Sequence, residues 1–503
     1  MSTEAEHISD RLLPADDVCR RARLSRDIRF DGVFFTVVKT TGIFCRPVCP
    51  VAPPLEKNVF YVPSAAEAFQ LGYRPCLRCR PETSPMSAAW LGNEAIAARV
   101  IRAVNQGQLQ HASVTQLAER MGISERYLRK LCQQYAGASP VQMDQARRSL
   151  LAKQLLFDSD LSITEIAFAS GYQSVRRFNE HWKQQFGQPP SAMRKRQASD
   201  NEEQSFKLYL TAPENYDFES LLAFFRLRQL HQIERVSDDE YQCCIRLSNG
   251  DTTVIKICFN RSRKRLELNL TTDALVFVSE IVVLVKRLFD LEAPVSRILS
   301  DLESDPNLSL AIDRLSLQDL RLPGTVTPFE AIFRAIVGQQ VSVKAAITIL
   351  NRILLRLYGE DSKSEVVLKP FPDAEDFTGF NFDGLGLPQA RINTLTSVVD
   401  AFIQQPWIFE FNADPEVRRN TLLEIKGIGP WTVNYLEMRA YAMPDAFPAG
   451  DLIVRQSYSQ LINSEKILTE KQLLKHAENW QPWRAYATLL LWQFYNAETA
   501  TRS

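Results

Sequence analysis

The stretch of sequence that decides the fold reads Lys426-Gly427-Ile428-Gly429-Pro430-Trp431 and, further on, Phe447-Pro448-Ala449-Gly450-Asp451. Apolar residues at Val417, Leu422 and Ile425 predict a short helix that ends just before Gly427. Gly427 and Gly429 permit a tight hairpin and leave backbone N–H groups uncovered. Because a glycine-lined helix N-terminus readily binds phosphate, the stretch predicts a site for a phosphate-bearing partner.

The residues after this hairpin predict two further helices. Pro430 suits the first turn of a helix because its missing N–H has no helical partner there. Apolar residues over 433–440 then keep helical spacing. Asp451 precedes the apolar run 452–454, so it is expected to open another helix, whose dipole favours an ionised carboxylate.

This pattern resembles the helix-hairpin-helix and Gly/Pro-Asp motif of base-excision DNA glycosylases, above all 3-methyladenine DNA glycosylase II. The later stretch Pro482-Trp483-Arg484-Ala485-Tyr486-Ala487 supports the resemblance. It implies a monofunctional glycosylase that flips an alkylated purine such as 3-methyladenine from duplex DNA and hydrolyses its N-glycosidic bond. It also implies that Asp451 stabilises the oxocarbenium-like sugar and orients water. Bifunctional relatives carry a lysine after the hairpin, where this chain has Trp431.

The same resemblance assigns residues that bind the base and the DNA. A cationic alkylated base is held by π faces, for which Trp431, Tyr435 and Trp492 are the candidates. Each of the three also suits a core position, Trp492 most of all. The residue that wedges into DNA in this family is usually apolar and corresponds here to Gln340, so the sequence leaves that role open. The two hairpin glycines are expected to contact the DNA backbone.

The composition indicates several domains and an anionic partner. The chain has 503 residues, which suggests three or four domains, and its net charge is formally zero. Residues 91–200 nevertheless carry 15 Lys and Arg against 9 Asp and Glu, or +6, and residues 11–82 carry 12 against 7, or +5. Such basic segments favour a nucleic acid. The polar residues 1–10 predict no secretory signal, and the run 276–291 is too short to cross a membrane.

Four of the nine cysteines form two close pairs. The pairs are Cys45-x3-Cys49 and, after 26 residues, Cys76-x2-Cys79. Two close pairs separated by a loop suit a tetrahedral zinc ion bound by four thiolates. Without a predicted secretory signal, metal or thiol chemistry is expected rather than disulfides. From spacing alone, a zinc site that only holds a small domain together is the simpler interpretation.

The residues around these pairs resemble the N-terminal domain of Ada, the methylphosphotriester repair protein. They read Gly42-Ile43-Phe44-Cys45-Arg46-Pro47 and Gly72-Tyr73-Arg74-Pro75-Cys76. The resemblance implies one Zn²⁺ bound by Cys45, Cys49, Cys76 and Cys79, with Cys45 as the methyl acceptor. Zinc keeps a sulfur deprotonated at neutral pH and therefore nucleophilic. The Pro-Cys-His-Arg sequence of the second Ada methyltransferase does not occur in the chain, so O6-methylguanine repair is not predicted.

Residues 88–196 contain a repeated helical pattern. Ser113-Val114-Thr115-Gln116 and Ser162-Ile163-Thr164-Glu165 lie 49 residues apart and both predict a capped helix start. A glycine and a second helix follow each, as in the two helix-turn-helix units of the AraC-type DNA-binding domain, which this segment resembles. Recognition helices are expected to begin near Ser124 and Ser174. The side chains expected to reach DNA are Arg126, Arg129, Lys130, Arg176, Arg177 and Asn179. The alternative is two helical hairpins with solvated charges.

A mixed segment follows a polar linker. Alternating apolar residues predict strands over 241–247, 252–259 and 265–270, and helical spacing predicts a helix over 216–229. This segment resembles the N-terminal domain of the same glycosylases, and we expect its cysteines to be buried apolar residues.

The sequence therefore predicts a multidomain α+β protein. The expected parts are a disordered N-terminus at 1–16, a small zinc-binding domain at 17–83, an all-α double helix-turn-helix domain at 88–196, a linker at 197–204, a small α+β domain at 205–291 and an all-α helix-hairpin-helix glycosylase domain at 292–497. The resemblances imply that methyl transfer to Cys45 activates transcription. The expected partners are damaged duplex DNA, promoter DNA and RNA polymerase, without a membrane, in a bacterial cytoplasmic protein associated with the nucleoid.

Two alternatives stay open from the sequence alone. The first is a transcription factor whose C-terminal half is a catalytically inactive DNA clamp, against which Asp451 argues. The second is a zinc site that serves only DNA binding, without methyl transfer.

Overall fold

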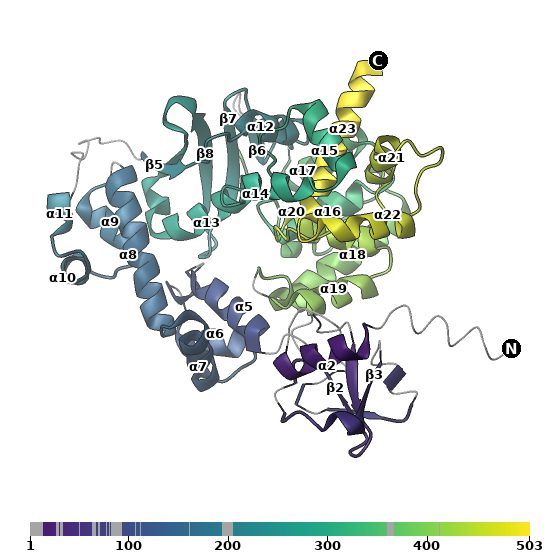
Figure 1. Ribbon diagram of the computed structural model, residues 1–503. Coiled ribbons are helices and arrows are strands. Elements are labelled where there is room, and N and C mark those ends of the chain that lie inside the picture. Colours follow the sequence, from purple (N-terminus) through teal and green to yellow (C-terminus); the bar gives the residue numbers. More distant parts are fainter. Residues whose placement is uncertain are drawn as a thin grey trace. The chain divides into compact units, whose positions relative to one another are not determined.

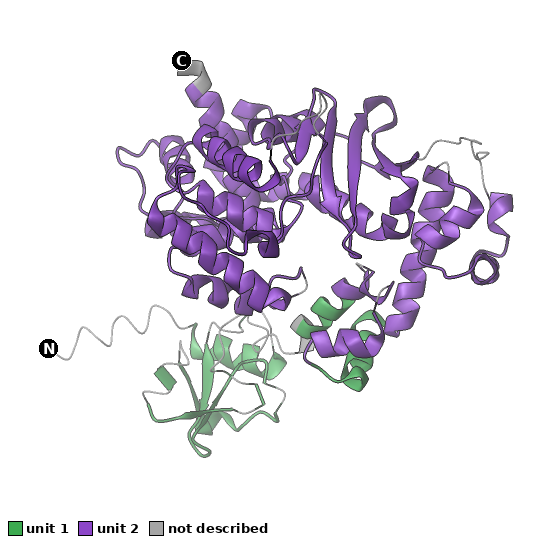
Figure 2. Cartoon of the chain, turned by 180° about the vertical axis from the view of Figure 1, so that it is seen from behind, with its two compact units in different colours: residues 1–101, 123–138 green, residues 102–122, 139–503 purple. Residues whose placement is uncertain are grey.

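The computed structural model of the chain (Figure 1) describes residues 14–26, 30, 34–49, 51–62, 67–68, 71–76, 78–79, 81, 93–105, 107–110, 112–159, 161–193, 205–359, 367–411 and 413–502. The predicted linker and most of the predicted disordered N-terminus lie outside these residues. None of the described helices is long and apolar enough to cross a membrane. Met1–Ile101 and Ile123–Ala138 form one compact unit, and Arg102–Gly122 and Ser139–Ser503 form a second (Figure 2).

The first unit contains a small four-stranded sheet. Its elements are α2 (Asp16–Ser25), β1 (Phe35–Val38), β2 (Ile43–Cys45), β3 (Val59–Val62) and β4 (Arg74–Pro75), with strand order β3-β1-β2-β4. β1 pairs antiparallel with β2 and β3, whereas β2 pairs parallel with β4. Phe35 and Val37 pack on one side with Phe44. Val38 belongs to a second cluster that contains Cys19 of α2, so the sheet is apolar on both faces.

The helices of the two predicted helix-turn-helix units begin at the predicted capping residues. Their helices are α5 (Asn93–Asn105), α6 (Val114–Arg120), α7 (Glu125–Ala136), α8 (Pro140–Asp158), α9 (Ile163–Ala169), α10 (Val175–Phe186) and α11 (Pro190–Met193). Ser113 caps α6 and Ser162 caps α9, each in a reciprocal capping box with Gln116 or Glu165. Ser124 and Ser174 cap the second helix of each motif, as expected.

A five-stranded antiparallel sheet forms the α+β segment. Its elements are β5 (Ser205–Thr211), α12 (Phe218–Leu227), β6 (Glu234–Val236), β7 (Glu240–Arg246), β8 (Thr252–Asn260), β9 (Arg265–Thr271), the 3-10 turn η5 (Thr272–Phe277) and α13 (Val278–Leu288), with strand order β5-β9-β8-β7-β6. The three predicted strands and the predicted helix are confirmed to within three residues at each end.

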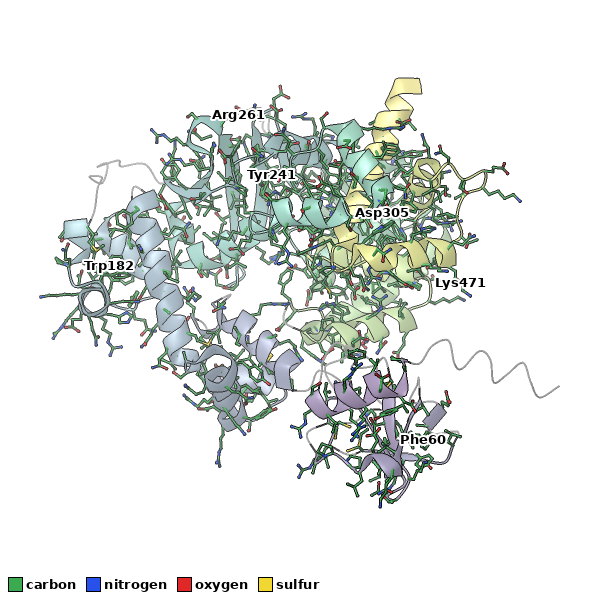
Figure 3. All side chains as sticks on the ribbon, viewed as in Figure 1. Phe60, Trp182, Tyr241, Arg261, Asp305 and Lys471 are labelled. Atoms are coloured by element: carbon green, nitrogen blue, oxygen red, sulfur yellow. The ribbon has the colours of Figure 1, made fainter. Side chains whose placement is uncertain are left out.

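The second helix-turn-helix motif shares its hydrophobic core with this sheet. Trp182 of α10 and Tyr241 of β7 are both buried members of that cluster, and Figure 3 labels both residues. Ser159 at the end of α8 forms a β-bridge with Leu208 of β5. The sequence pattern contained no sign of this contact, because the two surfaces lie far apart in the chain.

The remaining helices build two adjacent cores. They are α14 (Val295–Leu302), α15 (Pro306–Leu315), α16 (Pro328–Val337), α17 (Val343–Tyr358), α18 (Gln389–Gln404), α19 (Pro415–Glu424), α20 (Pro430–Arg439), α21 (Leu452–Leu461), α22 (Glu470–His476) and α23 (Arg484–Arg502). Helices α16 to α20 enclose one core, and α14, α15 and α21 to α23 enclose the other. The hairpin between α19 and α20 and the start of α21 form at the predicted positions.

One detail of the predicted hairpin is wrong. The helix before it ends at Glu424, and Ile425 has extended backbone angles. Val417, which we assigned to the apolar face of that helix, is 51% exposed, whereas Leu422 is fully buried. Helical spacing identifies candidate apolar positions but does not identify which of them becomes buried.

Candidate functional site

The hairpin between α19 and α20 requires one of its two glycines for steric reasons. Gly427 has φ +95°, and a Cβ at this position would overlap the Thr394 hydroxyl. That hydroxyl cannot move away freely, because it donates to the carbonyl of Lys426 at 2.9 Å. Gly429 has open space around it and an ordinary φ of −110°. At Gly429 the absence of a side chain therefore leaves the backbone accessible. The N–H groups of both glycines donate to no other residue in the described part of the chain.

Helix α20 carries two of the predicted aromatic residues on one face. Trp431 and Tyr435 lie one turn apart, with ring centroids 5.3 Å apart and planes inclined by only 17°. Trp492 comes from α23, and its ring centroid lies 6.4 Å from that of Tyr435. All three rings are part-exposed. Tyr435 and Trp492 also pack against the core of α14, α15 and α21 to α23, but none of the three rings is fully buried, which the sequence could not decide.

Asp451 lies where the three aromatic rings converge. It caps α21 by accepting the Val454 backbone N–H on Oδ1 at 3.0 Å. The indole Nε1–H of Trp431 donates to Oδ2 at 3.0 Å, and that of Trp492 donates to Oδ1 at 3.2 Å. Three N–H donors and the helix N-terminus therefore surround one carboxylate. The four residues predicted for the glycosylase site are brought together.

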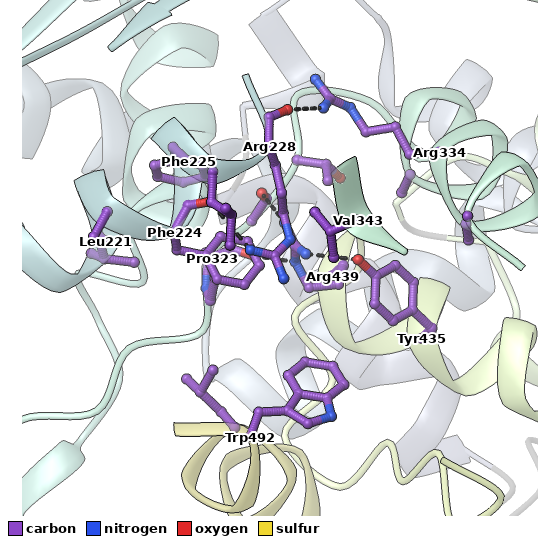
Figure 4. A pocket seen from close by; sticks show the side chains of 18 of the residues that line it. Leu221, Phe224, Phe225, Arg228, Pro323, Arg334, Val343, Tyr435, Arg439 and Trp492 are labelled. Atoms are coloured by element: carbon purple, nitrogen blue, oxygen red, sulfur yellow. Dashed lines mark hydrogen bonds between the residues drawn. The ribbon is translucent and has the colours of Figure 1, made fainter. Parts of the chain in front are cut away.

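These residues line a cavity of about 770 Å³. Tyr435 and Trp492 contribute to its wall from the helical segment, and Phe224 and Arg228 contribute from the α+β segment (Figure 4). Arg439 lies beside Tyr435 and donates to its hydroxyl at 2.9 Å. Sequence reasoning missed Phe224, Arg228 and Arg439. Phe224 and Arg228 lie in an ordinary amphipathic sequence of phenylalanines and arginines, so nothing in that sequence distinguished them as site residues.

The loop that carries Gln340 is attached to the hairpin through its neighbour. The Gln339 side chain donates from Nε2 to the Gly427 carbonyl and to the Thr432 hydroxyl, both at 3.1 Å. Gln340 itself is exposed and adopts the left-handed conformation with φ +55°. For a residue with a side chain this conformation is uncommon and costs free energy. The loop therefore holds Gln340 exposed to solvent, next to a residue that contacts the hairpin.

The sheet of the first unit brings the two cysteine pairs together. Strands β2 and β4 are parallel, with Phe44 opposite Pro75, so that Cys45 and Cys76 follow on neighbouring strands. The Cys76 N–H donates to the Phe44 carbonyl at 3.0 Å. Cys49 and Cys79 complete the group, and the four sulfurs lie within 4.8 Å of one another.

The four-sulfur group fits a zinc ion. Zn–S bonds of about 2.3 Å in a tetrahedron separate the sulfurs by about 3.8 Å, which is close to the observed grouping. None of the four forms a disulfide. Cys76 and Cys79 are buried, whereas Cys45 and Cys49 are part-exposed. The Arg46 N–H donates to the Cys79 sulfur at 3.4 Å, the kind of contact that stabilises charge on a metal-bound thiolate.

The residues predicted to contact DNA from α7 and α10 are accessible. Arg126, Arg129, Lys130, Arg176 and Arg177 are exposed, and Asn179 is half-buried. Arg129 pairs with Glu125 at 2.7 Å, and Arg176 pairs with Glu180 at 2.9 Å. Such surface pairs contribute little to stability, so DNA phosphates can replace the glutamates at small cost.

Three family models match the chain in the predicted order. They are the metal binding domain of Ada over residues 18–82, a helix-turn-helix domain over 117–196 and the AlkA N-terminal domain over 207–327. These matches confirm the three corresponding resemblances seen in the sequence.

Individual proteins match across larger parts of the chain. A Mycobacterium tuberculosis protein named "Probable bifunctional transcriptional activator/DNA repair enzyme AlkA" is 33% identical over 484 residues, which cover 94% of this chain and 95% of that protein. The Escherichia coli protein "DNA-3-methyladenine glycosylase 2" is 30% identical over 285 residues, or 55% of this chain and 93% of the relative. A solved 3-methyladenine DNA glycosylase from Archaeoglobus fulgidus has a TM-score of 0.50 at 18% identity, covering 57% of this chain and 98% of its own, and thus shares the fold.

The four-cysteine site predicts one tightly bound zinc ion per chain. Replacing one buried ligand, Cys76→Ser, should lower zinc affinity by orders of magnitude, because a hydroxyl replaces a thiolate. Zinc content measured by mass spectrometry, together with thiol titration, checks this. The matched control is Cys258→Ser, a part-exposed cysteine outside the group that donates to Glu240. Equal zinc content in the two variants would contradict the four-cysteine assignment.

Proposed function

Because this chain belongs to the family of bifunctional transcriptional activator and DNA repair enzymes named AlkA, we propose that it excises alkylated purines such as 3-methyladenine and couples methyl transfer onto Cys45 to transcription. The observation that carries the first activity is the Asp451 carboxylate, which accepts two indole N–H donors inside an aromatic cavity. The proposed domains are those expected from the sequence: 17–83 for methyl transfer, 88–196 for promoter binding, and 205–291 with 292–497 for excision.

Base excision follows from the charges that develop during the reaction. An N3- or N7-alkylated purine is a cation and a good leaving group, and the π faces of Trp431, Tyr435 and Trp492 stabilise it in the cavity. When the N-glycosidic bond breaks, its electron pair goes to the base and positive charge appears on the sugar. Asp451 stabilises that charge, and water adds to the sugar carbon and releases a proton.

The damaged base must be unpaired and flipped out of the duplex before it can enter the cavity. We assign the hairpin N–H groups of Gly427 and Gly429 to a DNA phosphate. Gln340, held outward by the strained backbone and by the Gln339 contacts, fills the gap left by the flipped base. Its amide can hydrogen-bond the orphaned partner base, which an apolar wedge cannot do.

Methyl transfer is proposed for Cys45, one of the two part-exposed cysteines of the four. The Cys45 sulfur attacks the methyl carbon of a methylphosphotriester, an S–C bond forms, and the C–O bond breaks with its electrons on the phosphate oxygen. The products are a thioether and an ordinary phosphodiester. A bound zinc ion supplies the deprotonated state of the sulfur. The exposed Arg74 and Arg78 can hold the DNA phosphates nearby.

The regulatory half is proposed to act at promoters. The exposed residues of α7 and α10 read promoter DNA, and the bound protein recruits RNA polymerase. This proposal gives the protein two DNA substrates, damaged duplex and promoter, and places it on the bacterial nucleoid.

Removing the charge of Asp451 tests the excision mechanism. Asp451→Asn keeps a side-chain acceptor for the Val454 N–H, so the fold should survive, but excision of 3-methyladenine should fall by about 10²-fold or more. Single-turnover base release measures this, and binding to undamaged duplex should be retained.

The matched control for that variant is a second helix-capping aspartate. Asp305 caps α15 and also accepts an indole N–H, from Trp480 at 2.8 Å, but it does not line the cavity. Asp305→Asn should cost stability and leave excision by the folded protein unchanged. Near-normal excision by Asp451→Asn would exclude this carboxylate from the mechanism. Absence of excision by the wild-type chain would instead favour an inactive DNA clamp.

Excision without strand cleavage is a separate expectation. The described residues that line the cavity contain no lysine, and Trp431 occupies the position that follows the hairpin. An amine is needed to form a Schiff base with the sugar. Borohydride should therefore trap no covalent complex with DNA. Heating the same reaction in alkali reveals the abasic sites and confirms that excision took place. A trapped adduct would refute hydrolysis as the sole outcome.

Methylation of Cys45 is expected to strengthen promoter binding. Four thiolates on Zn²⁺ total −2, and a thioether reduces this to −1, which lowers repulsion from the DNA backbone. Promoter affinity should rise several-fold after exposure to methylphosphotriester DNA, and the slope of log affinity against log salt should steepen by about one. Affinity at two salt concentrations, with mass spectrometry to verify the methyl group, measures both. If fully methylated and unmethylated protein bind the promoter with equal affinity, methylation of Cys45 does not regulate promoter binding. If Cys45 stays unmethylated, the zinc site serves DNA binding only.

A further inference from the structure

The α+β segment contributes one cation to the cavity in which Asp451 lies. Arg228 follows the C-terminus of α12, and its guanidinium carbon stacks 3.7 Å from the centre of the Phe224 ring. It points into the space bounded by Tyr435 and Trp492 (Figure 4). Arg228 therefore reaches the proposed base-binding space from the α+β segment, whereas Trp431 and Tyr435 reach it from α20.

The hydrogen-bonding capacity of Arg228 is almost unused. Its guanidinium makes one long bond, from Nη1 to the Phe224 carbonyl at 3.4 Å, and among the described residues no carboxylate pairs with it. The neighbouring Arg439 differs, since its donors reach the carbonyls of Pro323 and Gly324 and the Tyr435 hydroxyl. Burial lowers the pKa of Arg228 to about 10, so it is still a cation at neutral pH. A cation with free donors in a cavity is suited to bind acceptor atoms of a ligand.

Arg228 is also held in place. Its backbone carbonyl accepts Nη1–H of Arg334 at 2.9 Å. Arg334 in turn pairs with Glu234 at 2.9 Å and with Glu330 at 2.7 Å. Together with the Phe224 stack, these contacts fix the direction of the guanidinium before any ligand arrives. Such preorganisation is what a recognition group needs for specificity.

The ligand edge that suits a guanidinium fork is the O6 and N7 pair of a 6-oxopurine. Arginine binds these two acceptors bidentately, whereas adenine presents an N6 amino donor beside N7 and is matched by a glutamine or asparagine amide. Resting on the proposed excision activity, we propose that Arg228 is a specificity-determining residue that favours 3-methylguanine, whose O6 and N7 are both free acceptors, over 3-methyladenine in the cavity. The positive charge of the base does not affect this choice, because 3-methyladenine and 3-methylguanine carry the same charge.

The test measures the ratio of two bases released in one reaction. Duplex DNA treated with dimethyl sulfate contains both 3-methyladenine and 3-methylguanine, and chromatography of the free bases gives their relative kcat/KM. Arg228→Gln should lower the ratio of 3-methylguanine to 3-methyladenine by about tenfold, because the amide matches adenine. Arg228→Met, which has no donors, should lower it less. Arg228→Lys keeps the charge without the fork and should not restore the wild-type ratio.

A neighbouring arginine provides the control. Arg226 lies in the last turn of α12, is exposed, pairs with Asp238 at 3.1 Å and does not line the cavity. Arg226→Gln should leave the ratio unchanged. An equal loss of both bases in Arg228→Gln would overturn the inference, since it indicates a structural role or a phosphate contact, and so would an unchanged ratio. Release of neither base by the wild-type chain would instead overturn the excision activity on which the inference rests.

Discussion

The interaction on which the rest of the site depends is the set of N–H donors around the Asp451 carboxylate. Trp431 from α20 and Trp492 from α23 both donate to it, and the start of α21 supplies a backbone N–H. A carboxylate is a costly group to hold in an aromatic cavity unless it is hydrogen-bonded. The hydrogen bonds that stabilise the charge of Asp451 also orient the two indole rings. One group of contacts therefore positions both the carboxylate and the aromatic wall of the cavity.

A buried ion cluster in the wall of this cavity joins the α+β segment to the helical segment. Arg334 of α16 lies between Glu234 of β6 and Glu330 of its own helix. Burial raises the pKa of the Glu330 carboxyl, and the Arg334 guanidinium opposes that shift. A buried ion cluster adds little net stability compared with apolar packing. Its value here is geometric, because the same arginine fixes the backbone of Arg228 at the cavity wall.

Within the second unit, the second helix-turn-helix motif and the five-stranded sheet share one hydrophobic core. Arg147 of α8 donates to the Ser279 hydroxyl of α13 at 2.7 Å, and Ser159 forms a β-bridge with Leu208. The second helix-turn-helix motif therefore packs on the sheet and is not an independent domain, although the sequence that connects the two is polar. By contrast, the zinc-binding sheet has its own two small apolar clusters. A metal site that closes such a small core compensates for its limited apolar area.

The sequence by itself determined the features whose causes are local. Capping boxes at Ser113 and Ser162, the proline at the start of α20, the helix-capping Asp451 and the cysteine spacing each depend on residues that are neighbours in the chain. Only the tertiary structure decided that Trp492, 41 residues after Asp451, packs against the core and also lines the cavity, and that Arg228 reaches the same cavity. The physical reason is that helical spacing identifies an apolar face but does not specify what packs against it. The packing of segments far apart in sequence makes that choice, because each buried face must find a complementary surface.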